Sequence, residues 1–382
     1  MIGKDSIYAF ALSGIFRYEP RLAKAAYEAL GGTQAIFMLD KDGLTELLGP
    51  YCRYRDAILE TDLDKTGERL ESIIEKGYRY IAITDDDYPE SLRICEDAPM
   101  GLFVDSRSSI AGIFGTRRIA VVGTRDISPY GKTWCNRIVG AVSRTKERPC
   151  IVSGLAFGTD ITAHLAALDG NLPTIAVLGS GIGDIYPRQH SMYAERIREA
   201  EGCAIVSEYP PGTDIGAINF LSRNRIIAGL SEAVVLVESK IKGGGMTTAR
   251  IASSYSRDVF AVPGRNDDIR SQGCNFLIRT HIAEPLIDCG DFISSAGLAK
   301  RASRSISDLT EYAGQHAGNG RSADTICRIL KIIRSSPGIS IGEISSSTGT
   351  AFHETLAIAG EMESDGMIDV DLLQRCTLTK QR

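Results

Sequence analysis

The stretch RIAVVGTRDISP, residues 118–129, decides the fold of the middle of this chain. Ile119–Val122 is an apolar, β-branched run with the length of a buried strand. Gly123 permits a tight turn, Ser128 is a favoured helix N-cap, and Pro129 suits the first helical turn. The stretch therefore predicts a strand, a glycine turn and a helix in direct succession.

The same alternation of strands and helices continues along the chain. Further apolar runs with the length of buried strands lie at Cys150–Val152, Thr174–Leu178, Ala204–Val206, Ala233–Val237 and Val259–Val262. Helical patterns separate most of these runs, which predicts an α/β fold with a parallel sheet covered on both faces. Such sheets bind ligands at the carboxyl ends of their strands.

The flanking segments have a different character. A length of 382 residues predicts two or three domains. Residues 1–80 show short helical patterns broken by glycine and proline, which predicts a helical module before the α/β domain of residues 81–295. Residues 296–321 are rich in Ser, Ala, Gly and Arg and predict a linker. Residues 322–382 carry three helical patterns and a β tail, which suggests a winged helix.

The composition excludes several classes of protein. Hydrophobic residues make up 43% and charged residues 24% of the chain, as in ordinary folded proteins. No apolar run approaches the roughly 18 residues of a membrane span, and no apolar leader follows Met1, so we expect a cytoplasmic protein. The nine cysteines include no CxxC pair and the five histidines stand alone. We therefore expect reduced thiols and no metal site.

The net charge of −5 is unevenly distributed. Residues 1–114 hold 13 Lys/Arg against 20 Asp/Glu, residues 115–295 hold 20 against 18, and residues 296–382 hold 10 against 10. Anion binding is therefore expected in the middle region, as a local patch rather than a broadly basic surface.

Four glycine-containing loops follow predicted strands. They comprise residues 122–125, 153–160, 179–181 and 242–248. Backbone amides and helix N-termini gather at such loops, and glycine allows close approach, so together the loops predict a phosphate-binding cradle. The order KGGG at residues 242–245 is not a P-loop, in which lysine follows the glycines, and no GxGxxG fingerprint is present. ATP hydrolysis is therefore not expected.

Arg223, Asn224 and Arg225 form a dense basic and amide group. Two interpretations are equally supported. The arginines either clamp carboxylates between helices or bind phosphates through their guanidinium forks. Glu208 is one carboxylate that could orient either arginine.

A series of longer blocks carries a more specific resemblance. The blocks are Asp87–Arg93, Ala120–Arg125, Ser128–Gly131, Ser153–Ala156, Thr174–Gly179, Ile185–Pro187, Ser207–Gly212, Arg223–Ser231, Thr248–Arg250, Val259–Gly264 and Gly273–Asn275. In their order and number they make the chain similar to the DprA/Smf family (DNA-processing protein A). The resemblance implies an extended Rossmann-like domain that binds single-stranded DNA, between a SAM-like helical domain and a winged-helix domain. It also implies a homodimer that protects incoming DNA and loads RecA recombinase onto it during natural transformation. The family it resembles is not enzymatic and needs no cofactor.

The family's DNA pocket is carried over at matching positions. Arg125 matches the arginine of the family's Gly-Ser-Arg loop, with Thr124 in place of the serine. Ser153 and Gly154 match its Ser-Gly-Leu-Ala loop, and Lys242 matches the lysine of its Lys-Ser-Gly-Ser loop. The full set of residues predicted to bind DNA is Thr124, Arg125, Ser153, Gly154, Phe157, Arg223, Asn224, Arg225, Lys242, Gly243, Gly244 and Met246.

Three positions depart from the family pattern. Phe157 replaces an arginine, which removes a charge and offers an aromatic face. Gly243–Gly245 lacks the hydroxyl donors of the family loop but keeps its backbone donors, and His281-Ile282 replaces Gly-Ala. Met246 either presents an apolar face to a base or belongs to the core.

The main alternative is an enzyme of the nucleoside monophosphate phosphoribohydrolase type. Such Rossmann relatives also carry glycine-rich phosphate loops, but they need a carboxylate beside the loop. Residues 246–250 contain none, whereas Glu208 and Glu238 end strands and remain candidates. A third interpretation is an adaptor that has lost DNA binding, and the presence of Arg125 and Lys242 argues against it.

Overall fold

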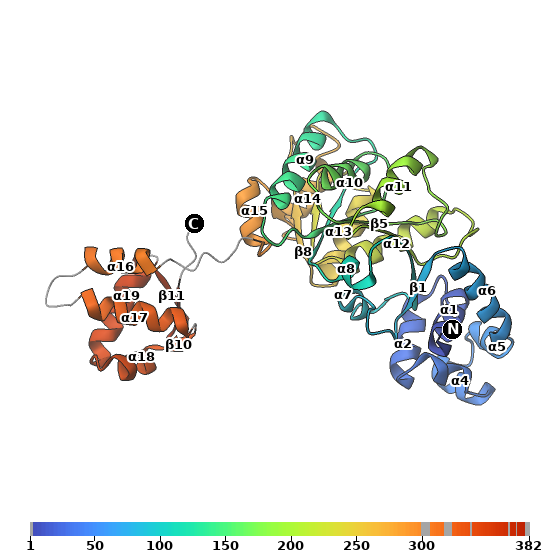
Figure 1. The fold of residues 1–382 in the computed structure, drawn as a ribbon, viewed down its shortest axis with the longest axis horizontal. Helices are drawn as coiled ribbons and strands as arrows, with labels where there is room; N and C mark the ends of the chain where they lie inside the picture. Colours follow the sequence, from blue (N-terminus) through green and yellow to red (C-terminus); the bar gives the residue numbers. More distant parts are fainter. Residues whose placement is uncertain are drawn as a thin grey trace. The chain divides into compact units, whose positions relative to one another are not determined.

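The computed structural model describes residues 3–298, 306–316, 323–336, 338–365, 367–371 and 373–378. The chain forms two compact units, residues 1–298 and residues 299–382 (Figure 1). Within the described ranges, no helix is long and apolar enough to cross a membrane.

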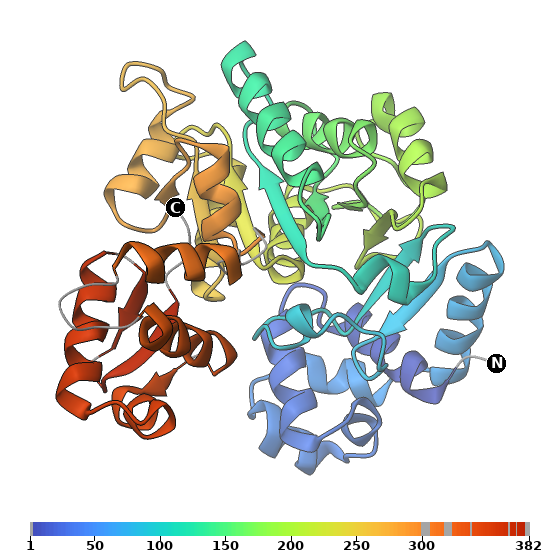
Figure 2. The ribbon, with the colours of Figure 1, turned by 60° about the vertical axis from the view of Figure 1, so that its left-hand side comes forward.

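A nine-stranded sheet runs through the described part of the first unit (Figure 2). Its strands are β1 (Arg79–Ala82), β2 (Gly101–Asp105), β3 (Arg118–Val122), β4 (Cys150–Ser153), β5 (Thr174–Val177), β6 (Ala204–Ser207), β7 (Ala233–Leu236), β8 (Asp258–Ala261) and β9 (Glu284–Pro285). Their order is β1-β2-β6-β5-β4-β3-β7-β8-β9. In this order, the seven strands β6, β5, β4, β3, β7, β8 and β9 are parallel to one another. The strands β1 and β2 pair antiparallel with each other, and β2 also pairs antiparallel with β6. The predicted α/β fold with a mostly parallel sheet is confirmed, and all six predicted strands are present.

Helices cover both faces of this sheet. In β3, Ile119 and Val121 share a core with α9 and α10, whereas Ala120 and Val122 share a core with α12 and α13. The helices around the sheet are α7 (Glu90–Arg93), α8 (Ile110–Phe114), α9 (Pro129–Ser143), α10 (Thr159–Asp169), α11 (Ser191–Glu199), α12 (Ala217–Leu230), α13 (Gly244–Ser254), α14 (Gln272–Arg279) and α15 (Cys289–Ser295), with a short 3₁₀ turn at Arg188–His190. The predicted start of α9 is confirmed, because the Ser128 side chain accepts a hydrogen bond from the Gly131 amide.

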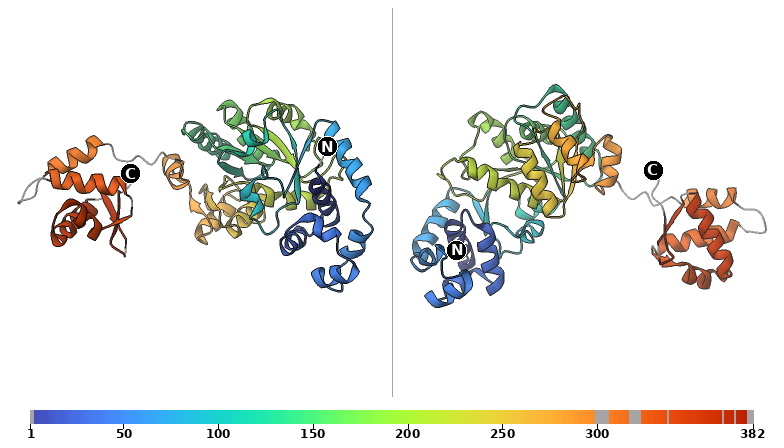
Figure 3. Two further views of the ribbon diagram at one scale, coloured as in Figure 1. Left: turned by 60° about the horizontal axis from the view of Figure 1, so that its bottom comes forward. Right: turned by 180° about the vertical axis from the view of Figure 1, so that it is seen from behind.

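Six helices precede the sheet. They are α1 (Lys4–Ile15), α2 (Pro20–Leu30), α3 (Thr33–Phe37), α4 (Lys41–Leu48), α5 (Tyr54–Leu59) and α6 (Leu63–Glu75). α1 packs beside β1 and β2 (Figure 3), and Leu12 and Phe16 belong to the same hydrophobic cluster as Ile81 and Leu102. The six helices share their core with the sheet, and both belong to the unit of residues 1–298.

The second unit is small and mixed. Its described elements are α16 (Ile306–Gln315), α17 (Ala323–Ser335), α18 (Ile341–Thr348), α19 (Phe352–Ser364) and the strands β10 (Ile339–Ser340), β11 (Ile368–Val370) and β12 (Arg375–Leu378), paired in the order β10-β12-β11. α16 lies inside residues 296–321, so the interpretation of that whole segment as a linker is wrong. Leu309 and Ala313 of α16 are buried with Ile326 and Ile329 of α17. The sequence of α16 has four apolar residues, Ile306, Leu309, Tyr312 and Ala313, but Ser, Ala, Gly and Arg dominate the segment around it.

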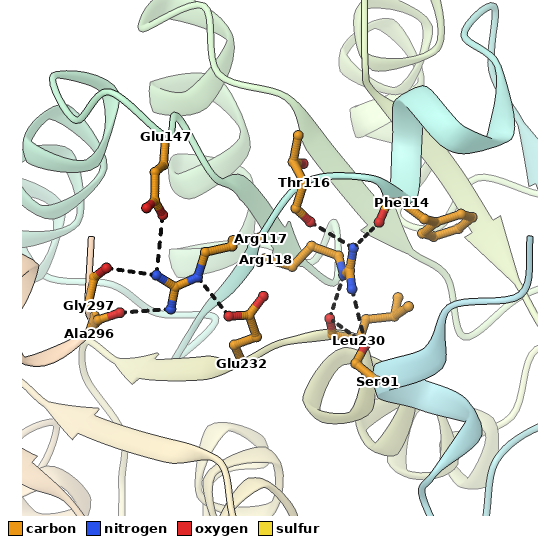
Figure 4. A network of polar contacts seen from close by, with 10 residues as sticks. All are labelled: Ser91, Phe114, Thr116, Arg117, Arg118, Glu147, Leu230, Glu232, Ala296 and Gly297. Atoms are coloured by element: carbon orange, nitrogen blue, oxygen red, sulfur yellow. Dashed lines mark hydrogen bonds and ion pairs between the residues drawn. The ribbon is translucent and has the colours of Figure 1, made fainter. Parts of the chain in front are cut away.

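Two neighbouring arginines at the start of β3 bind surrounding helix ends and turns (Figure 4). Arg118 is buried at the start of β3, and its guanidinium donates to the carbonyls of Leu230 at 2.7 Å, Thr116 at 2.8 Å and Phe114, and to the Ser91 hydroxyl. Arg117 points the other way, pairs with Glu232 at 2.7 Å and donates to the carbonyls of Ala296 and Gly297. Together they tie α7, the turn before β7 and the end of α15 to one strand.

We expect Arg118→Met to lower the free energy of unfolding of the first unit by about 2–4 kcal/mol, because buried carbonyls lose a charged donor. Urea denaturation followed by Trp134 fluorescence measures this, since Trp134 lies in α9 and is the only tryptophan of the chain. Arg107→Met is the matched control, because Arg107 forms an exposed ion pair with Glu199. Equal denaturation midpoints for the two variants would contradict the role given to Arg118.

Candidate nucleic-acid interface

A cleft of about 680 Å³ opens at the carboxyl ends of β3 and β7. These strands are neighbours in the sheet, and the chain runs outward from them in opposite directions, through β4 on one side and β8 on the other. Parallel sheets bind ligands at such a switch point, because the loops after the two strands diverge there. The cleft is lined by residues 122–126, Ala156, Asp160, Tyr186, residues 215–217, Phe220, Leu221, Arg223, Asn224, Ile227, Ser239, Lys240, residues 243–245 and Thr248.

The floor of the cleft requires two glycines. A Cβ on Gly245 would lie 2.7 Å from the Leu236 side chain and 3.1 Å from the Gly123 Cα. A Cβ on Gly123 would collide with the Thr159 side chain. Only glycine therefore lets the turn after β3 and the start of α13 approach this closely.

Glu238 holds the turn after β3 in place. It is buried at the end of β7, its carboxylate accepts hydrogen bonds from the amide and the hydroxyl of Ser128, and its carbonyl accepts one from the Thr124 amide at 2.7 Å. Glu238 thus fixes the start of α9 through its carboxylate and the loop that carries Arg125 through its backbone carbonyl. Because it is engaged in this way, Glu238 serves the structure of the loop.

Two exposed cations and two aromatic rings face the cleft. Arg125 and Lys240 line it and are both exposed. The Arg125 guanidinium lies 5.7 Å from the centre of the Phe220 ring, and that ring lies 5.3 Å from the Tyr186 ring. Arg125, Lys240 and the neighbouring backbone amides thus form a cationic wall of the cleft, and Tyr186 and Phe220 form an aromatic wall that meets it where Arg125 lies over Phe220.

Arg223 lines the cleft but is buried. Its guanidinium donates to the Val177 carbonyl, and a Cβ on Gly154 would collide with it, so Gly154 makes room for this side chain. Burial lowers the pKa of Arg223, and the nearby Asp160 carboxylate opposes this shift. Burial likewise raises the pKa of Asp160, against the effect of Arg223. The pair sits at the back of the cleft and shapes it.

Arg225 does not line the cleft. It is buried and forms a 2.6 Å ion pair with Glu208, which is also buried. Of the two interpretations of the basic group, the carboxylate clamp is confirmed for Arg225. Asn224 and Arg223 line the cleft.

The structure places the other predicted residues as follows. Thr124, Gly243 and Gly244 line the cleft, and Gly154 lies behind it against Arg223. Ser153 is buried, and its hydroxyl donates to the Val121 carbonyl, so its hydroxyl supports the sheet. Met246 is 1% exposed and belongs to the core, which decides between its two interpretations.

Phe157 and Lys242 are exposed but are not among the lining residues of the cleft. The Phe157 ring packs edge-on against His190 at 4.8 Å and leaves 45% of the residue exposed. Lys240, Tyr186 and Phe220 line the cleft and are not among the residues predicted from the sequence. Tyr186 belongs to the block Ile185–Pro187 and Phe220 lies shortly before the block Arg223–Ser231, but no local pattern showed that they meet.

No cluster of three or more potential metal-ligating side chains occurs in the part of the chain that the structure describes. The sheet order and the glycine-floored cleft define a doubly wound α/β protein with its site at the switch point. The family model described as DNA recombination-mediator protein A matches residues 79–297, more than half of the chain. The chain belongs to this family, as its resemblance to DprA/Smf proteins predicted.

Individual relatives agree with this assignment. The chain is 39% identical over 232 residues to the protein Smf of Synechocystis, a match that covers 60% of this chain and 56% of that protein. The chain thus spans little more than half the length of that relative. A crystal structure of DNA processing protein A from Streptococcus pneumoniae matches with a TM-score of 0.65 and 29% identity, over 77% of this chain and 98% of that one.

A second solved structure concerns the single-stranded DNA binding mode of DNA processing protein A from Helicobacter pylori. It matches with a TM-score of 0.51 and 28% identity, over 57% of this chain and 94% of that one.

We expect Gly245→Ala to lower the free energy of unfolding by about 1–3 kcal/mol, because the added methyl group has no space between Leu236 and Gly123. Gly244→Ala is the matched control, since nothing lies within 4 Å of its added Cβ and alanine favours helix. Urea denaturation of the two variants beside the wild type measures the difference. A Gly244→Ala variant as destabilised as Gly245→Ala would contradict the close backbone contact.

Proposed function

We propose that this protein binds single-stranded DNA in the cleft between β3 and β7 and acts as a recombination mediator rather than as an enzyme. The observation that carries the proposal is the two-sided cleft, with cations and amides on one wall and aromatic rings on the other. A single strand presents the same two faces, charged phosphates and flat bases.

The cationic wall suits phosphates. Arg125 and Lys240 are exposed and can follow a flexible backbone, and Arg223 adds positive charge behind them. The start of α13 also lines the cleft, and its N-cap Gly243 has no side chain to occupy the first helical amides. Free amides at a helix start favour an anion. Lys242 stands just before this helix start, and we retain it as an outer phosphate contact.

The apolar wall suits bases. Tyr186 is 43% exposed and tilts against Phe220, while Ile215 and Leu221 extend the same wall and are each more than half exposed. Aromatic faces stack with every base and give affinity without sequence preference. Phe157 is not among the residues that line the cleft, so we propose that it contacts the part of the DNA strand that extends beyond the cleft.

The wider role rests on the family. The Helicobacter pylori relative supports single-stranded DNA as the ligand, and the family's description supports mediation of recombination. We extend this to a cytoplasmic homodimer that protects incoming DNA and loads RecA recombinase onto it in natural transformation, without a cofactor.

The alternative of a phosphoribohydrolase needs an available carboxylate. Glu238 is held by Ser128, and Glu208 is held by Arg225 outside the cleft. Asp126 pairs with Arg270 at 2.9 Å, and Asp160 accepts from the Ala156 amide beside Arg223. Each carboxylate therefore has a partner that holds its loop, which favours binding over catalysis. Release of free base from nucleoside monophosphates would support the alternative.

Binding should favour single strands over duplexes, because a flexible strand can enter a recessed cleft and a stiff duplex cannot. Fluorescence anisotropy with a labelled oligonucleotide, competed by the same strand unlabelled or annealed to its complement, measures this preference. Affinity should also fall as salt rises, because phosphate contacts release counterions. Equal competition by strand and duplex at one ionic strength would refute the proposed site.

We expect Arg125→Ala and Lys240→Ala each to weaken oligonucleotide binding by about 1–3 kcal/mol without unfolding the protein, because each removes one charged phosphate contact. Lys242→Ala is the informative comparison, since Lys242 is equally exposed but stands outside the lining. Its effect should be smaller than that of Lys240→Ala. A larger effect at Lys242 would mean that the DNA lies along the loop before α13, outside the cleft.

We further propose that the helices before residue 80 form a SAM-like domain and that residues 322–382 form a winged helix. The second unit is not expected to hold the DNA strand. α19 carries Glu354, Glu361 and Glu363 and no lysine or arginine, so it would repel phosphates.

Deletion of residues 299–382 should therefore leave the oligonucleotide affinity within a few-fold of that of the full chain. The compactness of residues 1–298 makes this truncation reasonable. Circular dichroism of the truncated protein controls for folding. A hundredfold loss, about 2.7 kcal/mol, would assign DNA binding to the second unit.

A further inference from the structure

A second cavity, of about 490 Å³, lies between the N-terminal helices and the loop after β6. α1 and α6 form one side of it, and Glu208, Tyr209, Pro210 and Thr213 form the other. Its volume falls within the range of small-ligand sites. None of its lining residues belongs to the cleft at the switch point.

Two arginines converge on this cavity with their charges uncompensated. Arg17 lies 5.3 Å from the Tyr209 ring centre, and Arg69 lies 5.8 Å from the Phe10 ring centre. Among the described residues, neither guanidinium has a carboxylate within ion-pair distance, and the Arg17 Nε is buried without a hydrogen-bond partner. Lys65 also lines the cavity and pairs with the exposed Asp62 at 3.2 Å. Arginines held over aromatic rings keep their outer N–H groups available for an anion.

A buried acceptor stands on the opposite side. Glu208 is 8% exposed and lines the cavity, and its Oε1 is bound by Arg225. Its Oε2 is buried and has no hydrogen-bond partner in the described part of the chain. An unpaired buried acceptor is costly, so the site favours a ligand that brings a hydroxyl or amino donor to it.

These features specify the chemistry of the ligand. The arginines require an anion with several oxygen acceptors, and Glu208 requires a neutral or cationic donor. A nucleoside monophosphate combines a phosphate with sugar hydroxyls or base amines. Inorganic phosphate would satisfy only the arginines.

We propose that the cavity between α1, α6 and the loop after β6 is a second binding site, separate from the cleft, that takes the phosphate of a nucleotide. Arg17 and Arg69 bind the phosphate, and Glu208 Oε2 accepts a hydrogen bond from the sugar or the base. The nucleotide is either free or the 5′-terminal residue of a DNA strand.

The loop from Glu208 to Ala217 connects the two sites. Its first residues line the cavity, and Ile215, Gly216 and Ala217 line the cleft. Occupation of the cavity can therefore act on the apolar wall of the cleft through this one segment of backbone, in which Thr213 lines the cavity and Ile215 lines the cleft.

Isothermal titration calorimetry of the full chain with deoxyadenosine 5′-monophosphate tests the site. Arg17→Gln and Arg69→Gln should each lower the affinity about tenfold, because each removes one charged phosphate contact. Arg69 is exposed, so its replacement should not disturb folding. Arg21→Gln is the control, since Arg21 is an exposed arginine of α2 outside the cavity. It should leave the affinity unchanged.

The titration is repeated with Arg125→Ala, which weakens the cleft and leaves the cavity intact. Nucleotide binding that survives Arg125→Ala and falls with Arg69→Gln supports the cavity even if the cleft binds no DNA. Equal binding of deoxyadenosine and its monophosphate, or no response to Arg17→Gln and Arg69→Gln, overturns the proposal.

A second arm separates the two sources of the phosphate. If the phosphate comes from a DNA end, removing the 5′-phosphate from a short oligonucleotide weakens its binding to the wild type but not to Arg69→Gln. If it comes from a free nucleotide, removing the 5′-phosphate leaves the affinity for the oligonucleotide unchanged, and Arg17→Gln and Arg69→Gln lower only the affinity for the monophosphate.

Discussion

The site depends on a close contact between two backbone segments, where Gly123 meets Gly245. The start of α13 comes this close to the turn after β3 because Gly245 has no Cβ, whereas the missing Cβ of Gly123 makes room for Thr159 and the Glu238 carbonyl. Glu238 binds both Thr124 and Ser128 and so orients the loop that bears Arg125. A larger residue at Gly245 would push α13 away from the turn, and one at Gly123 would push the turn away from Thr159 and Glu238.

Helix α12 shows how one short motif serves two purposes. Arg223 and Arg225 are two positions apart, so the helix directs them to different sides. Arg223 turns toward the cleft and is held by the Val177 carbonyl, whereas Arg225 turns toward Glu208 and closes a buried ion pair. Loss of either partner would leave an uncompensated buried charge. Arg225 therefore stabilises the fold, although its place in the sequence suggested a phosphate ligand.

The loop after β6 links the cleft and the cavity beside α1 and α6. Glu208 pairs with Arg225 through one oxygen and faces the N-terminal helices, while Ile215 reaches the aromatic wall of the cleft. The N-terminal helices pack on the sheet through a shared core, so they are held against this loop. A binding event beside α1 and α6 is thereby placed next to the element that shapes the cleft.

The sequence by itself determined the α/β fold, the six central parallel strands and the start of α9, because buried strands, glycine turns and N-caps are local patterns. It also located the glycine loops and Arg125. It missed β1, β2 and β9, whose places at the edges of the sheet come from tertiary pairing, and it interpreted α16 as linker. Only the tertiary structure decided which neighbours in sequence face the cleft. Lys240 lines it and Lys242 does not, Met246 and Ser153 turn inward, and Tyr186 meets Phe220 from a distant loop. The direction of a side chain depends on the packing of elements far apart in the chain, which no local pattern records.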